Sequence, residues 1–432
     1  MNRSPRLLLA SASPRRLAML EGAGVAVEVR AAHLDEAPHT GESPGPHALR
    51  VALEKAVSVA RSRSPEDPPF VLASDTVVTL DGQILGKPLD ALDAVATLRR
   101  LSGRLHHVLT AFALLDRRGL ILAHELTKTA VQFRPLTGEE IEAYVATGEP
   151  LDKAGAYGIQ GGAGRFVESV DGPYESVVGL PLAAVLAALH RFGVVGPPAD
   201  PFALRLALVR GRIAAAASAV NRSVADVTLV AVSKRHDAAS LRAALGAGQR
   251  DFGENYTQEL AVKALALASE TWPPRWHFVG HLQSRKAREL PAGLALVHAL
   301  DSDSAAAALE REAQRRGLSH FDVLVQVNLT PDPQRSGLRA EDVPAFLESV
   351  KRFERVRVSG LMTLPAEGPL FASRATFARL ATLRDACATP TRPLHALSMG
   401  MSGDFDQAIA EGATIVRIGT TLFGERVLGS PP

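Results

Sequence analysis

The stretch GPPADP, residues 196–201, decides how the chain is divided. Its prolines lack an amide donor and fix φ, so neither a helix nor a strand within a sheet can run through it. The apolar pattern before it predicts a closing helix over 180–192, and the pattern after it predicts an opening helix over 204–220. We therefore predict two modules, residues 1–195 and 202–432, joined by a linker at 196–201.

Length and charge agree with this division. A chain of 432 residues exceeds the usual size of one hydrophobic core, and at roughly 150 residues per domain it would hold about two to three domains. The formal net charge is +2 with 22% charged residues, so acidic and basic groups nearly balance. Nucleic acid is therefore not expected as a partner, and any anion binding must be local.

The cellular compartment is suggested by what the sequence lacks. The apolar run at 7–10 is far shorter than a signal-peptide core of about 7 to 15 residues, and no segment reaches the roughly 18 apolar residues of a membrane helix. The single cysteine, Cys387, excludes an intrachain disulfide and a multi-cysteine metal site. We expect a cytoplasmic chain with no membrane partner.

The first module begins with a candidate anion site. A short apolar strand at 6–11 leads into SPRR at 13–16 and an amphipathic helix at 17–23. Backbone amides at a helix start attract anions, and the guanidinium groups of Arg15 and Arg16 are planar forks suited to phosphate oxygens. The arginine pair alone is equally compatible with a solvated basic turn.

Lysines and carboxylates follow on the next predicted elements. Lys55 lies inside a predicted helix over 47–62, and Asp75 interrupts an apolar strand over 69–80. An aspartate is a poor strand former and is costly to bury unpaired, so we expect Asp75 to face a cation or a metal. Four cations could neutralise a polyphosphate: Arg15, Arg16, Lys55 and Lys87. Two carboxylates, Glu36 and Asp75, could hold Mg²⁺ and orient or deprotonate water. These pieces fit a phosphate-handling hydrolase.

The remainder of the first module mixes strands and helices. The patterns predict strands at 25–31, 106–115 and 127–133, and helices at 92–101 and 139–147. The glycine-rich stretch that follows, up to residue 181, has little periodicity, which is typical of binding loops.

The motifs of this module, in order, are SASPRR, the acidic pair at 35–36, ALEKA, ASDTVV, GKP, SGRLHHVLTA and DKAGAYGIQG…VDGPYESVVGLPL. Over nearly all of 6–190 they resemble the Maf family of nucleoside triphosphate pyrophosphatases, hydrolases acting on acid anhydrides. The resemblance implies a mixed α/β fold with a deep cleft, a divalent metal (Mg²⁺ or Mn²⁺), and products that are a monophosphate and pyrophosphate. It implies site roles for Ser11, Arg15, Arg16, Glu36, Lys55, Asp75, Lys87 and Gln160, with Glu36 and Asp75 on the metal.

Two dipeptides refine the expected substrate. Asp75-Thr76 together with Ile159-Gln160 resembles the branch of the family that acts on dTTP and UTP, rather than the branch that acts on 7-methyl-GTP. Gln160 offers both a donor and an acceptor, which suits a pyrimidine edge, and Thr76 joins the expected nucleotide-binding set. A homodimer, if one forms, is expected to use this module.

The second module alternates strand-like runs with helical patterns. The runs lie at 228–233, 251–253, 276–279, 295–299, 323–329, 357–361, 395–397 and 414–418, and the helical patterns lie at 238–245, 257–269, 304–316, 343–353, 375–388 and 405–411. Such repetition predicts a parallel (β/α)8 barrel. In that architecture chemistry lies where the strands end, and a phosphate site follows the last two.

Lys234 ends the first of these strands. At an apolar strand terminus a lysine is desolvated, its pKa falls from about 10.4, and its neutral amine can attack an aldehyde to form a Schiff base. The alternative is a lysine that reaches solvent at the barrel rim. Small and polar residues at 398–402 and 417–420 would let backbone amides approach a phosphate, which favours pyridoxal phosphate as the aldehyde.

The motifs LVAVSKRHD, DFGENYTQE, WHFVGHLQSRK, LVQVNL, RSGL, SGLMTLP and LSMGMSGDFDQAI…GATIVRIGTTLFGER resemble the YggS-type pyridoxal phosphate homeostasis family over about 210–426. The resemblance implies a fold like the alanine racemase barrel, with pyridoxal 5'-phosphate as a Schiff base on Lys234. The implied cofactor-binding set is Lys234, Asn255, His277, Met362, Ser398, Arg417, Gly419 and Thr420. Arg335 stands where such families commonly have lysine, so transfer through a second lysine there is not carried over, although Arg335 could guard the pocket by charge.

Three interpretations of activity stay open. The barrel is a non-enzymatic cofactor carrier, or it is an amino-acid racemase, or one of the two modules is a silent binding or regulatory domain. Racemases of this fold carry an extra β domain and a second acid/base, normally tyrosine, on the opposite face of the cofactor, whereas this sequence stops at Pro432 soon after the expected barrel closes. We therefore expect a bifunctional fusion of a pyrophosphatase and a cofactor carrier.

Overall fold

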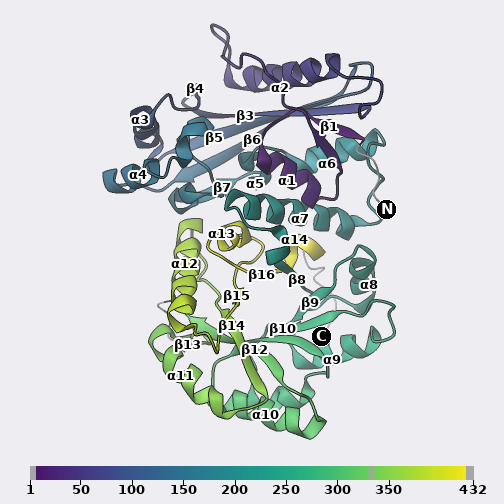
Figure 1. Ribbon diagram of the computed structural model, residues 1–432, viewed down its shortest axis with the longest axis vertical. Helices are drawn as coiled ribbons and strands as arrows, with labels where there is room; N and C mark the ends of the chain where they lie inside the picture. The colour runs from purple at the N-terminus through teal and green to yellow at the C-terminus, as the bar shows by residue number, and fades with distance from the viewer. Residues whose placement is uncertain (1–5, 331, 333, 425–432) are drawn as a thin grey trace. The chain divides into compact units, whose positions relative to one another are not determined.

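The computed structural model describes residues 6–330, 332 and 334–424, and they form two compact units (Figure 1). The first unit comprises the described residues up to Pro198, with Ala207–Val224 and Pro369–Phe371. The second comprises Ala199–Leu206, Ala225–Gly368 and the described residues from Ala372 onward. The first unit gives way to the second within the predicted linker, but the residues predicted to open the barrel are shared between the units. The domain boundaries themselves stay a prediction.

The first unit is built on one mixed sheet. Its strands, in the order in which they pair, are β2 (Val27–Val29), β1 (Leu7–Leu9), β3 (Phe70–Leu80), β5 (Leu105–Leu115), β6 (Ile121–Phe133) and β7 (Val167–Asp171), with β4 (Gln83–Leu85) beside β3. β1 runs parallel to β2 and β3, and the other pairings are antiparallel. The helices are α1 (Pro14–Gly22), α2 (Pro44–Arg61), α3 (Ala91–Leu101), α4 (Gly138–Val145), α5 (Tyr174–Val178) and α6 (Leu182–Arg191).

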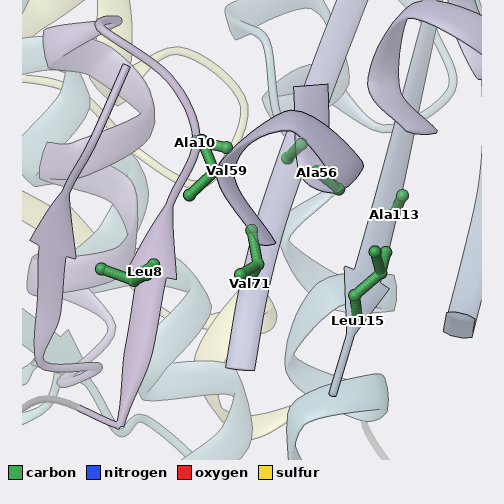
Figure 2. Close-up of a cluster of buried hydrophobic side chains, with 8 residues drawn as sticks. Leu8, Ala10, Ala56, Val59, Val71, Ala113 and Leu115 are labelled. Carbon is green, nitrogen blue, oxygen red and sulfur yellow. The ribbon is translucent and has the colours of Figure 1, made fainter. Parts of the chain in front are cut away.

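Helix α2 supplies one layer of the core. It begins at Pro44, whose ring suits the first helical turn, and its inward face repeats small apolar residues at helical spacing. Ala56 and Val59 of this face pack with Leu8 of β1, Val71 of β3 and other buried side chains, as Figure 2 shows. A second cluster, nearer the N-terminus of the same helix, joins Ala48 and Ala52 to β3 and β5. Burial of these side chains holds α2 against the sheet, because each Å² of apolar surface removed from water stabilises the fold by about 25 cal/mol.

A gap in strand pairing exposes the middle of β3. β1 pairs with β3 only over Phe70–Leu72, and β4 pairs with it only over Val78–Leu80. The intervening edge of β3 is therefore not covered by either strand. Ser74, Asp75 and Thr76 lie in this gap, so side chains from both faces of the strand adjoin the same unpaired edge. Arg16, in the first turn of α1, donates a hydrogen bond to Thr76 in this gap.

The second unit is a closed ring of parallel strands. Within the described residues the ring runs β8 (Thr228–Val232), β9 (Asp251–Glu254), β10 (Arg275–Phe278), β11 (Leu294–Leu300), β12 (Phe321–Asn328), β14 (Val356–Met362), β15 (Ala396–Ser398) and β16 (Ile415–Ile418), and β16 pairs with β8. The short β13 (Leu338–Arg339) adds to β12. The helices are α8 (Ala238–Gly246), α9 (Thr257–Ala266), α10 (Asp303–Arg316), α11 (Val343–Ser349), α12 (Leu370–Cys387), α13 (Phe405–Ala410) and α14 (Thr420–Phe423), while α7 (Pro201–Ala219) spans residues of both units.

The predicted fold class is confirmed in both halves. Each of the strands predicted for the barrel is present, and Val230, Leu324 and Met362 pack with other apolar side chains in its core. In the first unit the sequence patterns missed β4, β7 and α5. β7 and α5 lie inside the stretch expected to be an irregular loop, which also contains the short 3₁₀ turns Glu149–Asp152, Ala154–Ala156 and Gly162–Phe166. No helix among the described residues has both the length and the apolar character needed to cross a membrane.

Candidate functional site

The first unit contains a pocket of about 480 Å³ beside the uncovered edge of β3. Its lining includes every residue predicted for nucleotide, phosphate or metal: Ser11, Arg15, Arg16, Glu36, Lys55, Asp75, Thr76, Lys87 and Gln160. These residues come from the turn before α1, the first turn of α1, the loop after β2, α2, the middle of β3, the turn after β4 and the glycine-rich loop. The structure thus brings together residues far apart in the sequence, while their individual roles stay predictions.

A buried ion pair lies at the back of this pocket. The Lys55 Nζ atom is 2.8 Å from Asp75 Oδ1 and 2.9 Å from Glu36 Oε1. Lys55 and Asp75 are both buried, whereas the Glu36 side chain is 45% exposed. The expectation that Asp75 faces a cation is met by Lys55. Among the residues that the structure describes, no group of three or more His, Cys, Asp or Glu side chains could enclose a metal ion.

The two arginines of the SPRR motif differ in their surroundings. Arg16 donates from Nε to the Gly179 carbonyl at 2.7 Å, from Nη1 to Ser11 Oγ at 3.0 Å and from Nη2 to Thr76 Oγ1 at 3.2 Å. Desolvation lowers the pKa of Arg16, against the charge of Asp75, which raises it. Arg15 makes a long contact of 3.5 Å, from Nε to the carbonyl of Val178. Arg16 therefore holds the pocket wall together, and Arg15 is the freer of the two.

A chain of hydroxyl groups holds together the wall of the pocket formed by β3, β5 and the segment 176–179. Thr76 Oγ1 lies 3.0 Å from Thr110 Oγ1, and Thr110 Oγ1 donates to the Ser176 carbonyl at 2.7 Å. Ser74 Oγ donates to the Gly179 carbonyl at 3.1 Å. These bonds join β3 and β5 to the segment 176–179, which carries the carbonyl that Arg16 also uses.

Glu149 holds the loop that carries Gln160. Glu149 Oε1 accepts a hydrogen bond from the Tyr144 hydroxyl at 2.9 Å, Oε2 accepts one from the Gly162 amide at 2.8 Å, and the Gly158 amide donates to the same hydroxyl at 3.1 Å. A Cβ at Gly161 would lie 2.0 Å from Glu149 Oε1, so glycine is required for this close approach. Burial, with the charge of Glu149, raises the pKa of Tyr144, which keeps the hydroxyl a donor.

The cofactor residues predicted for the second unit lie where its strands end. Lys234 follows β8 by two residues and is half-buried, and the Gly419–Thr420 turn follows the paired strand β16. Lys234 itself lies in the turn that follows β8. Within the described part of the chain, the Lys234 amine has no hydrogen-bond or ion-pair partner. Asn255 and Met362 lie at the ends of β9 and β14.

Gly400 and Gly419 let the ends of β15, β16 and β8 approach one another. Gly400 has φ +92°, and a Cβ there would lie 2.6 Å from the Ala408 Cβ. The Gly400 carbonyl accepts a hydrogen bond from the Arg417 amide at 3.0 Å. At Gly419 a Cβ would meet the Val232 carbonyl at 3.1 Å. Glycine at these two positions therefore allows close packing of the chain at the ends of the strands, where the sequence predicted a phosphate.

A buried chain of hydrogen bonds crosses the barrel interior. His277 Nε2 is 3.0 Å from Asp251 Oδ1, His277 Nδ1 is 3.0 Å from His298 Nε2, and His298 Nδ1 is 2.8 Å from Ser398 Oγ. Arg417 donates to Ser398 Oγ and, at 2.9 Å, to the Thr363 carbonyl. Both ring nitrogens of His277 are thus used within the protein, so its contribution to a cofactor site would be to hold other groups in place.

The chain of hydrogen bonds has a carboxylate, Asp251, at one end and a cation, Arg417, at the other. Asp251 accepts from His277, and Arg275 Nη2 donates to its other oxygen at 2.5 Å. Burial would raise the pKa of Asp251, but the bonds from His277 and Arg275 lower it overall. Burial lowers the pKa of Arg417 to about 10, so it remains a cation at neutral pH. Burial, with the nearby His277 and Arg417, holds the pKa of His298 well below its usual range, so His298 is neutral.

Sequence reasoning missed Glu149 and His298. A histidine inside the apolar strand 294–300 is the same signal that singled out Asp75, a polar residue within a buried run, and it could have been found in that way. Glu149 carried no such signal, because it stands in a loop among glycines. Arg335, noted as a departure from the family pattern, lines a separate pocket of about 340 Å³ with Asn255, His281 and Gln326.

Replacing Glu149 should loosen the loop that carries Gln160. Glu149→Gln replaces the charged carboxylate that accepts hydrogen bonds from Tyr144 and Gly162 with an uncharged amide. A hydrogen bond to a charged group contributes about 1.5–3 kcal/mol to stability. We expect the amides of residues 158–162 to exchange hydrogen about tenfold faster or more, measured by mass spectrometry of the peptide. Glu142→Gln, an exposed residue of α4, is the matched control. Equal exchange in both variants would contradict this role.

The second unit should lose stability in mild acid because of His298. The unfolded chain protonates this histidine below about pH 6.5, whereas the folded protein keeps it neutral to a much lower pH. The unfolded state then binds more protons, so the free energy of unfolding falls as pH falls below about 6.5, by up to roughly 1.4 kcal/mol per pH unit.

His298→Gln should flatten that slope between pH 5 and 6.5. Urea unfolding can be followed by the fluorescence of Trp272 and Trp276, the two tryptophans of the chain, which both lie in this unit. His395→Gln, at an exposed position, should keep the slope of the parent protein. If His298→Gln has the same slope as the parent protein, His298 is not the group that titrates.

Comparisons with known proteins match each half separately. A family model described as Maf-like protein matches residues 6–192, and one described as Alanine racemase, N-terminal domain matches residues 209–427. A protein named dTTP/UTP pyrophosphatase from Geobacter sulfurreducens is 49% identical over 190 residues, which cover 44% of this chain and 98% of that protein. Another of that name, from an Anaeromyxobacter species, is 52% identical over 191 residues, which cover 44% and 90%.

Among solved structures, PipY of Synechococcus elongatus, described as a COG0325 family member, matches the second half. It is 38% identical in the structure without PLP, with a TM-score of 0.47, and the match covers 52% of this chain and 100% of that one. The two family models and the relatives of the first half show a fusion. The chain belongs to two families, with a Maf-like domain in its first half and a domain of the alanine racemase N-terminal family in its second.

Proposed function

We propose that the first module hydrolyses nucleoside triphosphates, dTTP and UTP foremost, to the nucleoside monophosphate and pyrophosphate. One water molecule is consumed: its oxygen bonds to the α-phosphorus, the bond from that phosphorus to the bridging oxygen breaks, and pyrophosphate leaves. The observation that carries this proposal is the convergence of cations and two carboxylates on a single pocket at the open edge of β3.

The charges of the pocket suit a triphosphate. Arg15 and the exposed Lys87 line the pocket and can neutralise phosphate oxygens, while Arg16 and Lys55 are held deeper by bonds within the protein. Positioning and charge compensation supply most of the catalysis in phosphoryl transfer, so little covalent chemistry is required of the side chains. Lys55 keeps the Asp75 and Glu36 carboxylates facing one point.

A divalent metal fits the two carboxylates. Mg²⁺ is commonly bound by one or two carboxylates, with phosphate oxygens and water completing six ligands, so a cluster of three acidic side chains is not required. Glu36 and Asp75 would hold the ion, and the ion would neutralise charge that develops on the phosphate oxygens. The oxygens that Lys55 does not contact are those available for this purpose and for orienting the attacking water.

The pyrimidine preference rests on Gln160 and on the relatives. Gln160 is buried in the pocket lining, on the loop that Glu149 holds, and its amide can present a donor and an acceptor to a pyrimidine edge. The curated proteins with which the first module shares about half of its residues are named dTTP/UTP pyrophosphatases. A homodimer through this module is part of the same proposal and rests on the resemblance alone.

The test is pyrophosphate release from a nucleotide panel with Mg²⁺ or Mn²⁺ present. dTTP and UTP should be hydrolysed well ahead of 7-methyl-GTP, and Asp75→Asn should lower kcat/KM by about 10² to 10⁴, as expected when a group that moves protons or holds a metal is neutralised. The matched control is Asp81→Asn, which changes an exposed aspartate on the neighbouring turn. A clear preference for 7-methyl-GTP would overturn the pyrimidine assignment, and full activity in Asp75→Asn would overturn the site.

We also propose that the second module binds pyridoxal 5'-phosphate through Lys234 and serves in homeostasis of this cofactor. Lys234 would hold the cofactor through its amine nitrogen, which would replace the aldehyde oxygen while that oxygen is released as water with two hydrogens from the amine. When bound, the cofactor supplies a reactive aldehyde in stored form. Lys234 is half-buried and its amine is not engaged by other described residues, so it is available for this step.

The other predicted residues suit the rest of the cofactor. The turn at Gly419 and Thr420 follows β16, which pairs with β8, and Gly419 packs closely on Val232 at the end of β8, so a phosphate group bound at this turn would be close to Lys234. Arg417 stays charged and is held by Ser398 and the Thr363 carbonyl, so it can face a ring nitrogen or oxygen without moving. The neutral His298 holds Ser398 in place through the hydrogen bond between His298 Nδ1 and Ser398 Oγ.

Racemisation is the weaker alternative. It requires a second acid/base on the opposite face of the cofactor, normally tyrosine. Tyr256 is the tyrosine of the second module, and it stands at the start of α9 with 49% of its surface exposed. An exposed phenol has no fixed position against a buried ring, which favours a carrier over a racemase.

An absorbance spectrum after incubation with pyridoxal phosphate tests the carrier proposal. The parent protein should show the visible band of a Schiff base, Lys234→Ala should lose it, and Lys351→Ala, an exposed lysine of the same unit, should retain it. Conversion of L-alanine to D-alanine at ordinary enzyme rates would replace the carrier by a racemase. A band that persists in Lys234→Ala would refute the assignment of the lysine.

A further inference from the structure

Behind Lys234 lies a buried cluster of charged groups that none of the predicted site residues includes. Lys263, on α9, is 5% exposed, and Glu254, at the end of β9, is fully buried. The Lys263 ammonium donates to Glu254 Oε1 at 2.6 Å, to Glu259 Oε1 at 2.7 Å and to the Ser233 carbonyl at 2.7 Å. An ammonium group has three hydrogens, so each of them is used.

The cluster grips the residues on both sides of Lys234. Ser233 Oγ donates to Glu254 Oε1 at 2.6 Å, and the Arg235 amide donates to Glu259 Oε1 at 2.5 Å. The Ser233 carbonyl, which Lys263 contacts, also accepts from the His236 amide at 3.0 Å and so closes the turn. Lys234 is therefore held through its two neighbours, while its own amine is left free of described partners.

The turn would not hold this shape unaided. Arg235 has φ +65°, a left-handed conformation that costs a residue with a side chain roughly 1–2 kcal/mol. The carboxylate of Glu259 on the Arg235 amide supports that conformation, and Lys263 in turn holds Glu259 one helical turn away.

Stability alone does not account for the cluster. A buried ion pair gains little over apolar side chains of similar size, because both charges must be desolvated. Burial raises the pKa of Glu254, although Lys263 and Ser233 lower it, and Glu254 Oε2 has no hydrogen-bond partner among the described residues. A costly arrangement that contacts both neighbours of one lysine is best explained by the placement of that lysine.

We propose that Lys263 is a positioning residue for Lys234: through Glu254, Glu259 and the Ser233 carbonyl it fixes the turn that presents the Lys234 amine to an aldehyde. Lys263 does not itself react, because its three hydrogens are engaged and its single charge is shared between two carboxylates. This inference rests on the proposed cofactor role of Lys234 and adds to it a residue that sets the rate and the site of the reaction.

The experiment measures where and how fast the cofactor-free protein reacts with pyridoxal phosphate. Samples are reduced with borohydride at timed intervals, digested, and the modified fraction of each lysine is read by mass spectrometry. In the parent protein Lys234 should react first. Two variants test the cluster. The first is Glu259→Gln, at a partly exposed position, and the second combines Lys263→Met with Glu254→Gln, so that both buried charges are removed together. Each should slow modification of Lys234 by about tenfold, the factor for losing one hydrogen bond to a charged group.

The controls separate positioning from folding and from the cofactor assignment. Glu270→Gln removes a carboxylate that pairs with Arg242 on the surface of the same unit, and it should react like the parent protein. Thermal unfolding of each variant shows whether the sample is folded at the temperature of the assay. If the double variant does not fold, Glu259→Gln alone decides the matter.

Two outcomes are distinct failures. If folded variants modify Lys234 at the parental rate, Lys263 has only a structural role and the inference is wrong, while the cofactor proposal stands. If the parent protein itself is not modified at Lys234, the cofactor proposal fails and the inference fails with it.

Discussion

A buried ammonium group has to be matched by carboxylates, and each half of this protein is arranged around one such match. In the first, Lys55 of α2 meets Asp75 of β3, and in the second, Lys263 of α9 meets Glu254 of β9. Removing an ion from water costs several kcal/mol, and its partner repays this only if the geometry is good. Each pair therefore fixes a helix against a strand at the place where the candidate chemistry lies.

The first pair is held in place by its apolar surroundings. Asp75 lies between Ala73 and Val77 on the face of β3 that packs on α2, and Lys55 lies between Ala52 and Ala56 of that helix. The clusters on either side set the distance between helix and strand, and the charges then have a single way to meet. Because neither β1 nor β4 covers β3 at this point, the pair is buried from behind and still accessible from the pocket.

The sequence predicted the features that differ in polarity from their neighbours along the chain, and missed those that depend on contacts with residues far away in the sequence. The barrel strands stand out as apolar runs between helical patterns, and Asp75 stands out as a charge within such a run, so both could be found. Lys263 could not, because a lysine in the helix 257–266 resembles any solvated lysine until its burial is known. β7 was missed for a similar reason: its residues are mostly exposed, and its partner strand, not its own pattern, makes it a strand.

The two candidate sites solve different electrostatic problems, which explains why their parts differ. A triphosphate with its metal carries much charge, so the first site needs several cations and carboxylates at an edge open to water, where exposed groups such as Lys87 and Glu36 cost little to keep charged. The single phosphate ester of the proposed aldehyde cofactor carries less charge, and the second candidate site offers one buried cation, Arg417, and a close-packed glycine, Gly419. The charge of Asp404 favours the ionised form of Arg417, and Ser398 Oγ and the Thr363 carbonyl accept hydrogen bonds from its guanidinium group, so the cation is matched within the barrel interior.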